Sequence, residues 1–302
     1  MAERKPAVSL AAMRGKRRAA LELAQTIERE GFCGIYCPSF GDGLGLCEAL
    51  ALVTKEIPFG TAIANIYTRH PHDYALTVTM IHELAPGRFR FGIGVSHGPV
   101  LERLGIRAGK PTADMEQFVS ALREGAARWG ALPPVVLASL RAPMIRLAAK
   151  IAEGAVWANA CRSHMAVSLA HLGGRAAETD FFLGNMIPTC IDEDRAAAAA
   201  VMRKTLTSYV LLPNYQRYWM EAGYEEEMRA IQAAIQARDY ERLPKLMSDR
   251  WLRDCTLFGS AREVREGVEA WYAAGVKTPI LVPSSTRGGQ FDAIAEVIAA
   301  FR

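Results

Sequence analysis

Ser96 and His97 are the two residues of this sequence best placed to do chemistry. They follow the segment FRFGIG at residues 89–94, in which aromatic and β-branched residues alternate with arginine and glycine, as in a β-strand. Gly94, at the end of this segment, leaves room for a ligand or for a second stretch of backbone. An imidazole titrates near pH ~6.5, so His97 can donate or accept a proton at physiological pH. The alternative is that Ser96 caps the next helix and that His97 is solvated.

A second candidate site follows another apolar run, VVLA at residues 135–138. A helix is predicted soon after this run, and the backbone N–H groups of a helix start, together with one arginine, make a site for a phosphate. Arg141 supplies that arginine, unless it is only a solvated loop cation. The residues of this loop are Ser139, Leu140, Arg141 and Ala142. Trp157 and Asn159 end the next predicted strand and can wall the same pocket, although a tryptophan there is more often part of the core.

The composition limits the classes of protein to consider. The chain has 302 residues, half of them hydrophobic, which is enough for a large core, and its net charge of +4 is too evenly spread to indicate nucleic-acid binding. We expect neither a signal peptide nor a membrane span, because no apolar run approaches the ~20 residues that a span needs. The six cysteines show no C-x-x-C pair and no zinc-type histidine spacing, so we expect no metal site and reduced thiols in the cytoplasm.

Strands and helices alternate along the chain. Strands are predicted at residues 7–11, 33–37, 59–64, 89–94, 134–138, 154–158 and 181–191, and around Leu281 and Val282. Helices are predicted at residues 16–30, 44–55, 72–84, 112–127, 144–152 and 261–274. A helix-rich insertion, which begins with a helix at residues 196–209, separates the seventh strand from the eighth. Eight such units predict an α/β fold of the (β/α)8 TIM-barrel type, in a single domain over residues 1–302. A Rossmann fold is rejected because its G-x-G-x-x-G fingerprint needs a glycine where His97 stands.

Four segments together carry a family resemblance. They are GFCGIYCPS at residues 31–39, IPFGTAIANIYTRHP at 57–71, ELAPGRFRFGIGVSH at 83–97 and LFGSAREVREGVEAWYAAGV at 257–276. These segments resemble the luciferase-like family of flavin and deazaflavin oxidoreductases. The pattern GRF-x-x-GIG-x-SH is similar to the branch that uses coenzyme F420, a deazaflavin, rather than FMN. The resemblance implies a (β/α)8 barrel with the cofactor across the carboxyl ends of the strands, hydride transfer or oxygen activation as its chemistry, and a homodimer.

The resemblance also implies where the cofactor lies. The segment Ala62, Ile63 and Ala64 lets the ring approach, and a non-prolyl cis peptide is expected there to back the ring, at Ala62–Ile63 or at Ile63–Ala64. Asn65 offers its amide to the ring edge or the ribityl chain, unless it is a turn residue. The loop with Arg141 meets the ribityl phosphate. The full set of expected cofactor contacts is Ser39, Ala62, Ile63, Ala64, Asn65, Gly94, Ser96, His97, Ser139, Leu140, Arg141, Ala142, Trp157 and Asn159.

Two departures from the family limit what the resemblance implies. Ser39 stands where many members carry a histidine beside the reactive part of the ring, and a serine is no acid near neutral pH. His97 stands where some deazaflavin enzymes carry a glutamate, so we assign it either the proton that completes reduction or a hydrogen bond to the cofactor. Only residues 125–133 separate the fourth helix from the fifth strand, where the family usually has an insertion. This predicts that the mouth of the barrel, the opening where the cofactor is expected, is more open on that side. The aromatic residues of the later insertion either form the opposite wall or pack among themselves.

The sequence thus favours an oxidoreductase that transfers a hydride between coenzyme F420 and an organic substrate with an activated C=C, C=N or C=O group. The open mouth suits a bulky small-molecule or peptide-borne substrate of specialised metabolism, with neither nucleic acid nor membrane as a partner. One alternative is an FMN-dependent luciferase-like monooxygenase, which needs a pocket that excludes water. The other is a barrel that binds a flavin or another ligand without turnover, because the family histidine is replaced by Ser39.

Overall fold

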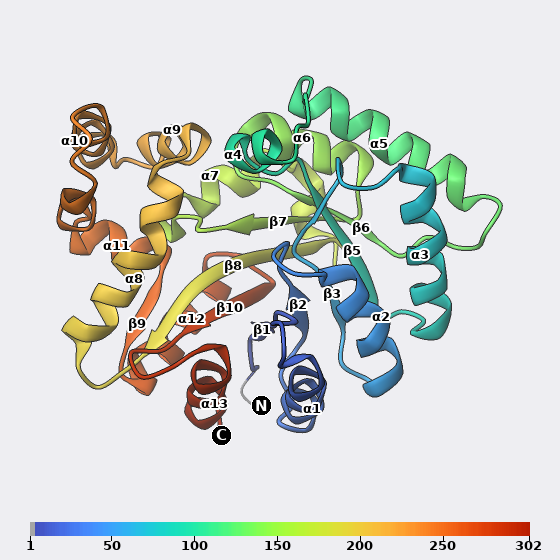
Figure 1. The fold of residues 1–302 in the computed structure, drawn as a ribbon, viewed down its shortest axis with the longest axis horizontal. Coiled ribbons are helices and arrows are strands. Elements are labelled where there is room, and N and C mark those ends of the chain that lie inside the picture. Colours follow the sequence, from blue (N-terminus) through green and yellow to red (C-terminus); the bar gives the residue numbers. More distant parts are fainter. Residues whose placement is uncertain (1–3) are drawn as a thin grey trace.

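The computed structural model describes residues 4–302, and within them a parallel sheet closes into an eight-stranded barrel (Figure 1). Its strands are β1 (Ala7–Ser9), β2 (Ile35–Cys37), β3 (Phe59–Thr61), β5 (Phe89–Gly94), β6 (Val135–Ala138), β7 (Gly154–Ala158), β8 (Phe182–Ile191) and β10 (Thr278–Ser284). The ring closes because β10 pairs with both β8 and β1. The predicted barrel is confirmed, and all eight predicted strands are present.

Two short strands lie beside this ring. The predicted strand at 59–64 is interrupted by a cis peptide between Ala62 and Ile63, and β4 (Ala64–Asn65) then pairs with β5. The cis bond is at the first of the two predicted positions. The other strand, β9 (Leu257–Gly259), was not predicted. It pairs with the end of β8, beyond the point where β7 stops pairing with that strand. It therefore covers the part of the β8 edge that has no partner in β7.

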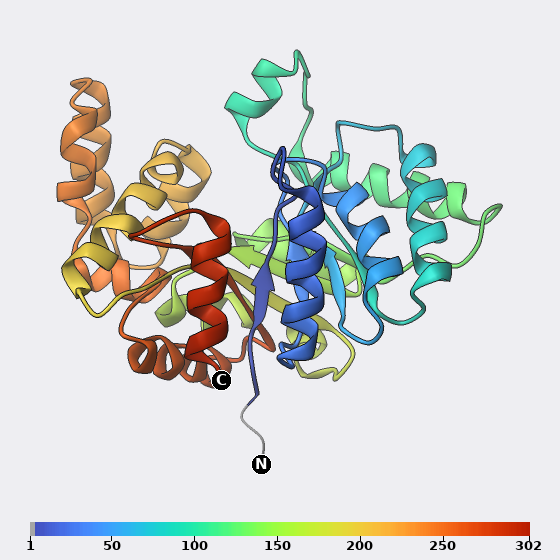
Figure 2. The same cartoon turned by 60° about the horizontal axis from the view of Figure 1, so that its bottom comes forward.

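Helices surround the barrel on its outside (Figure 1). They are α1 (Arg17–Arg29), α2 (Gly43–Val53), α3 (Pro71–Leu84), α5 (Pro111–Ala126), α6 (Ala142–Ile151), α12 (Ala261–Ala273) and α13 (Gln290–Ala300). Their apolar faces pack on the outward side chains of the strands, which is what amphipathic spacing provides. Smaller elements, not predicted, are α4 (Gly98–Arg103), α7 (Met165–Ala170), η1 (Arg162–His164) and η2 (Gly173–Ala177). The segment with α4 projects from the body in the turned view (Figure 2).

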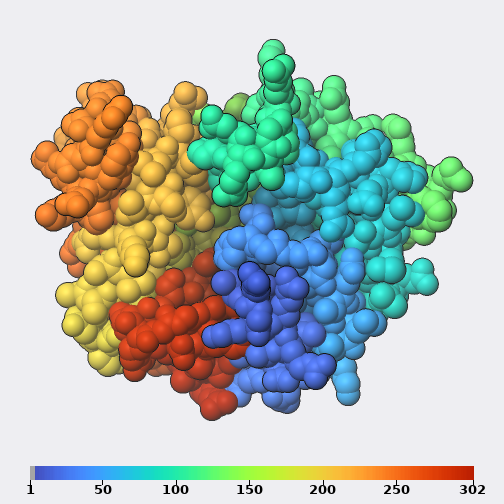
Figure 3. Space-filling model, in the orientation of Figure 1, coloured from blue at the N-terminus to red at the C-terminus, as the bar shows by residue number. Residues whose placement is uncertain are grey.

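The predicted insertion between the seventh and eighth barrel strands is confirmed. It contains α8 (Arg195–Val210), α9 (Pro213–Glu221), α10 (Glu225–Gln236), η3 (Tyr240–Leu246) and α11 (Asp249–Cys255), and leads through β9 to α12. These helices form one side of the molecule, next to α4 at the carboxyl ends of the strands (Figures 1 and 3). The insertion therefore lies where side chains can reach the mouth of the barrel.

The core has two layers. The barrel interior holds a small cluster of buried side chains: Ala7, Tyr36, Ala62, Val136, Val156, Phe182, Met186 and Ile280. A much larger cluster fills the space between the strands and the helices. Since side chains alternate along a strand, each strand residue faces either the interior or the helices.

Two further properties concern the part of the chain that the structure describes. No helix between residues 4 and 302 is long and apolar enough to cross a membrane. Over the same residues no three or more histidine, cysteine, aspartate or glutamate side chains gather in a way that could hold a metal ion. The six cysteines are free thiols, and all but Cys33 are buried.

Candidate functional site

Small apolar side chains form a floor at the carboxyl end of the barrel. Ile63, Ala138, Ala158 and Val282 pack on the interior cluster but remain partly exposed, unlike the residues beneath them. Gly94 keeps this floor flat, because a Cβ atom there would lie 2.9 Å from Ile63 Cδ1 and 3.0 Å from Ala138 Cβ. The floor is therefore an apolar surface that a flat ring can cover.

The chain comes very close to itself beside this floor. The hydroxyl of Thr61 donates a hydrogen bond to the carbonyl of Gly92 at 2.6 Å, and a Cβ atom at Gly92 would lie 1.9 Å from the Thr61 carbonyl oxygen. Only glycine is possible there. The cis peptide between Ala62 and Ile63 follows at once and turns the chain toward Ala64, which is partly exposed at the mouth.

Asn65 is placed at the mouth as a turn residue. Its side-chain Oδ1 accepts a hydrogen bond from the backbone N–H of Tyr67 at 3.1 Å, and its carbonyl accepts one from the Tyr74 hydroxyl at 2.8 Å. The oxygen of the side chain is thus already used inside its own loop. Its role as a cofactor contact, through the other amide atom, stays a prediction.

His97 lies at the mouth with its side chain unused by the backbone. It is the N-cap residue of α4 but makes no side-chain capping hydrogen bond, and its ring centroid lies 5.7 Å from that of Tyr215 in α9. Burial lowers the pKa of His97 below its usual value of 6.5, so the imidazole is mainly neutral at pH 7. Ser96, just before it, has a left-handed backbone with φ of +62°, a conformation that non-glycine residues adopt mainly at special sites. Ser96 therefore turns the chain so that His97 faces the insertion.

Asn159 closes the end of β7 in a similar way. It has φ of +54°, is only 2% exposed, and its side-chain nitrogen Nδ2 has no hydrogen-bond partner. Its carbonyl accepts a hydrogen bond from Trp219 Nε1 at 3.2 Å. Burial raises the pKa values of Tyr209 and Tyr215, while contact with the Asn159 side chain opposes the shift, so both phenols near this amide are neutral.

The start of α6 has a charge but no cap of its own. Arg141 is the N-cap residue and makes no side-chain capping bond. Its guanidinium instead binds the Glu221 carboxylate at the end of α9, with Nε at 3.0 Å and 3.1 Å from the two oxygens. Arg141 is therefore a paired, partly exposed cation, and its contact with a phosphate stays a prediction. Ala142 follows, partly exposed, as the first residue of α6.

Of three other predicted contacts, Ser139 and Leu140 are less available than expected, whereas Ser39 is accessible. Ser139 is 2% exposed, and its hydroxyl donates to the Leu137 carbonyl at 3.1 Å. Leu140 packs against the outer core. Ser39 is exposed in the loop after β2, at the same end of the barrel as the floor.

Trp157 requires a correction. Its neighbours Val156 and Ala158 belong to the barrel interior, so alternation turns Trp157 toward the helices, where it is 1% exposed in the outer core. The structure does not bring it to the mouth, and the commoner role of a buried tryptophan is the one it has.

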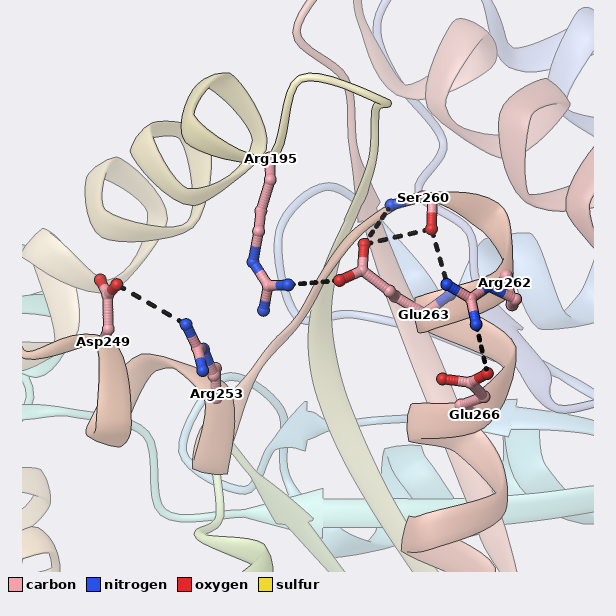
Figure 4. Close-up of polar contacts among 7 residues, drawn as sticks. All are labelled: Arg195, Asp249, Arg253, Ser260, Arg262, Glu263 and Glu266. Carbon is pink, nitrogen blue, oxygen red and sulfur yellow. Dashed lines mark hydrogen bonds and ion pairs between the residues drawn. The ribbon is translucent and has the colours of Figure 1, made fainter.

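The start of α12, another helix beside the mouth, is closed by its own residues (Figure 4). Ser260 and Glu263 form a capping box: Ser260 Oγ accepts from the Glu263 N–H at 3.3 Å, and Glu263 Oε2 accepts from the Ser260 N–H at 2.9 Å. Arg195 also pairs with Glu263. Surface ion pairs between Arg262 and Glu266 and between Arg253 and Asp249 lie nearby.

Sequence reasoning did not identify Glu221, and it left Tyr215 undecided between wall and packing. Tyr215 is buried and packs among aromatic rings, with Tyr209 edge-on at 5.1 Å, Trp219 tilted at 5.3 Å and His97 at 5.7 Å, and its role as a wall stays a prediction. Glu221 lies 80 residues from Arg141, and no local pattern indicates that pairing.

Comparisons with known proteins support the fold. A 5,10-methylenetetrahydromethanopterin reductase of Archaeoglobus fulgidus is 23% identical over 259 residues, covering 75% of this chain and 77% of the relative. The structure of the coenzyme F420-dependent tetrahydromethanopterin reductase of Methanopyrus kandleri superimposes with a TM-score of 0.71 at 16% identity, covering 98% of this chain and 97% of that one. The oxygenating constituent of 3,6-diketocamphane monooxygenase of Pseudomonas putida, solved with FMN, gives 0.61 at 17% identity, covering 98% and 96%.

The model of one protein family matches most of the chain. That family is described as luciferase-like monooxygenase, and the match covers residues 4–278. The chain belongs to the luciferase-like monooxygenase family and is an oxidoreductase with that family's barrel.

Proposed function

We propose that this protein transfers a hydride between coenzyme F420 and an organic substrate with an activated C=C, C=N or C=O group. The observation that carries the proposal is the pairing of a flat apolar floor with an uncapped helix start that bears an arginine. The structural neighbour described as coenzyme F420-dependent supports this cofactor, whereas the neighbour solved with FMN keeps FMN as the alternative.

The residues present fit a flat ring joined to a phosphate. Ile63, Ala138 and Ala158 would lie under the ring, and Gly94 lets Ile63 and Ala138 pack closely beneath it. The phosphate would lie at the start of α6, where the first N–H groups of a helix lack partners within the helix and Arg141 supplies positive charge. When bound in reduced form, the deazaflavin supplies the hydride.

His97 is the residue that we assign to the proton. Its ring is at the mouth and is not consumed by helix capping. Because burial lowers its pKa, His97 donates a proton most readily on the acid side of pH 7 and is mainly a neutral hydrogen-bond partner above it. Asn159, with its buried and unpartnered Nδ2 atom, supports a second polar contact at the mouth.

We propose as substrate a small molecule or a peptide-borne group of specialised metabolism. The loop between α5, which ends at Ala126, and β6, which begins at Val135, is short. It leads into the amino end of β6, whereas the floor lies at the carboxyl ends of the strands. The open mouth expected from this short loop therefore does not follow from it.

We also propose that the protein is a cytoplasmic homodimer. The six free thiols are consistent with a reducing compartment. On the outer face of α3, Leu76, Met80 and Leu84 are 37%, 47% and 47% exposed, and Trp129 beside them is 48% exposed. Spacing of four residues places the three α3 side chains on one stripe, and such an exposed apolar stripe suits a second copy of the chain.

Titration of the purified protein with coenzyme F420 and with FMN, followed by cofactor fluorescence, tests the cofactor. We expect micromolar binding of coenzyme F420 and weaker binding of FMN; tight FMN binding without F420 binding would favour the monooxygenase. Single-turnover absorbance of the reduced cofactor with candidate enones, imines and ketones separates an enzyme from a binding protein. Oxidation of the bound cofactor by one of these acceptors, and not by buffer alone, is the result expected for an enzyme.

A further inference from the structure

Helix α9 is fastened across three loops at the mouth. Its Tyr215 faces His97 after β5, and its Tyr218 hydroxyl accepts a hydrogen bond from the Cys161 N–H after β7 at 2.9 Å. Its last residue, Glu221, binds Arg141 after β6. Tyr218 is buried, but Glu221 and Arg141 have side chains 44% and 31% exposed. The contact at the end of the helix is therefore the one that a ligand arriving from solvent can reach.

Glu221 holds Arg141 as an anionic ligand would. Both carboxylate oxygens of Glu221 accept from Nε, and Nη2 of the same guanidinium also bonds to one of them. Planar recognition of this kind serves carboxylates and phosphates equally well. The side chain of Arg141, the N-cap residue of α6, makes no capping bond, so the Glu221 carboxylate occupies the place on the guanidinium that the proposed function gives to the cofactor phosphate.

We propose that Glu221 is a built-in competitor for the phosphate of the cofactor at Arg141, and so sets the affinity of this site. The inference rests on the proposed function. Binding exchanges the Arg141–Glu221 pair for an Arg141–phosphate pair and releases the end of α9, while the buried contact between Tyr218 and Cys161 keeps the rest of the helix in place. An ion pair that is partly exposed competes only modestly, so removal of the competitor should tighten binding about two- to fivefold.

Glu221→Gln tests this proposal, because glutamine keeps the shape of the side chain and removes its charge. Glu225→Gln is the matched control, because Glu225 lies in α10, has a side chain 59% exposed, and pairs with Arg229 of the same helix instead of with Arg141. Dissociation constants for coenzyme F420 and for FMN are measured by fluorescence titration for the wild type, both variants, Arg141→Gln and the Arg141→Gln/Glu221→Gln double variant. We expect Glu221→Gln alone to bind the cofactor more tightly, and the gain to vanish when Arg141 is also replaced.

A merely structural ion pair gives the opposite result. If Glu221→Gln weakened binding or left it unchanged while the protein stayed folded, as checked by thermal unfolding, the proposal would be overturned. If neither cofactor bound, the proposed function would fail, and inorganic phosphate would serve as the probe. A larger rise of the melting temperature with phosphate in Glu221→Gln than in the wild type would then support the competition, and equal rises would refute it.

Discussion

The helix starts that follow the strands of this barrel are of two kinds. The start of α12 is closed by its own next turn, since Ser260 and Glu263 satisfy each other's N–H groups and Arg195 covers the charge (Figure 4). The start of α6 has no side-chain cap, and its Arg141 is paired with a residue from the distant insertion. The N-cap residue of α4, His97, likewise makes no capping bond.

This difference indicates which helix start contributes to stability and which helix starts are available to a ligand. A cap made by residues three positions apart forms with the helix itself and leaves nothing for a ligand. A helix start without such a cap leaves the N-cap side chain free to contact other groups, as Arg141 contacts Glu221 and His97 contacts Tyr215. We therefore expect substitutions at α12 to change folding, and substitutions at α4 and α6 to change binding and turnover.

The largest effect is expected at His97. His97→Ala should lower the rate of single-turnover cofactor oxidation on an accepted substrate about 100-fold, the usual contribution of a positioned proton donor, and leave cofactor affinity within about twofold. In the wild type that rate should fall as pH rises through the lowered pKa of His97, and the variant should lose this dependence. An unchanged rate in His97→Ala would remove it as the proton donor.

Arg141→Gln comes next. Loss of a charge-assisted hydrogen bond should weaken cofactor binding about tenfold. Arg195→Gln, the matched change at the closed start of α12, should leave the dissociation constant unchanged. Equal effects of the two substitutions on cofactor fluorescence titrations would show that the two helix starts do not differ in the way described.

Ser260→Ala should act on folding alone. Removal of an N-cap hydroxyl typically lowers the free energy of unfolding by about 1 kcal/mol, measurable by urea denaturation. Cofactor affinity should stay that of the wild type. Weaker cofactor binding in a fully folded Ser260→Ala protein would show that the start of α12 belongs to the site, and would contradict the difference between the two kinds of helix start.

The smallest effect concerns pH. The hydrogen bond from the Ser260 N–H lowers the pKa of Glu263 below its usual value of 4.5, so this carboxylate stabilises the fold above that value, and the contribution is lost as pH falls through the lowered pKa. Glu263→Gln should therefore be less stable than the wild type at neutral pH, by less than about 1 kcal/mol, and the difference should shrink toward pH ~3. A difference that does not change with pH would contradict the assigned role of the carboxylate.

The sequence predicted the barrel well because its signals are local. Predicted helices such as 72–84 and 112–127 match α3 and α5 within two residues. Gly31, which follows the first helix, has a left-handed φ of +75°, the conformation that glycine favours at a helix end. The short strand β9 was not predicted, because its pairing with the end of β8 is a contact between segments far apart in the sequence. It exists because the end of β8 would otherwise lack a partner on one side.

The site was only partly predictable. Gly94 and the cis peptide after Ala62 follow from small residues at a strand end and from the family resemblance. Trp157 was misplaced because the prediction ignored strand parity, which sets it opposite to Val156. The contact between Arg141 and Glu221 joins residues that only the folded insertion brings together, and no spacing in the sequence encodes it.

A crystal structure of the protein with coenzyme F420 tests the central claim most directly. We predict that the deazaflavin ring lies on Ile63, Ala138 and Ala158, with its phosphate on Arg141 and with Glu221 displaced. A cofactor bound elsewhere on the barrel, or a phosphate held away from the start of α6, would contradict the account.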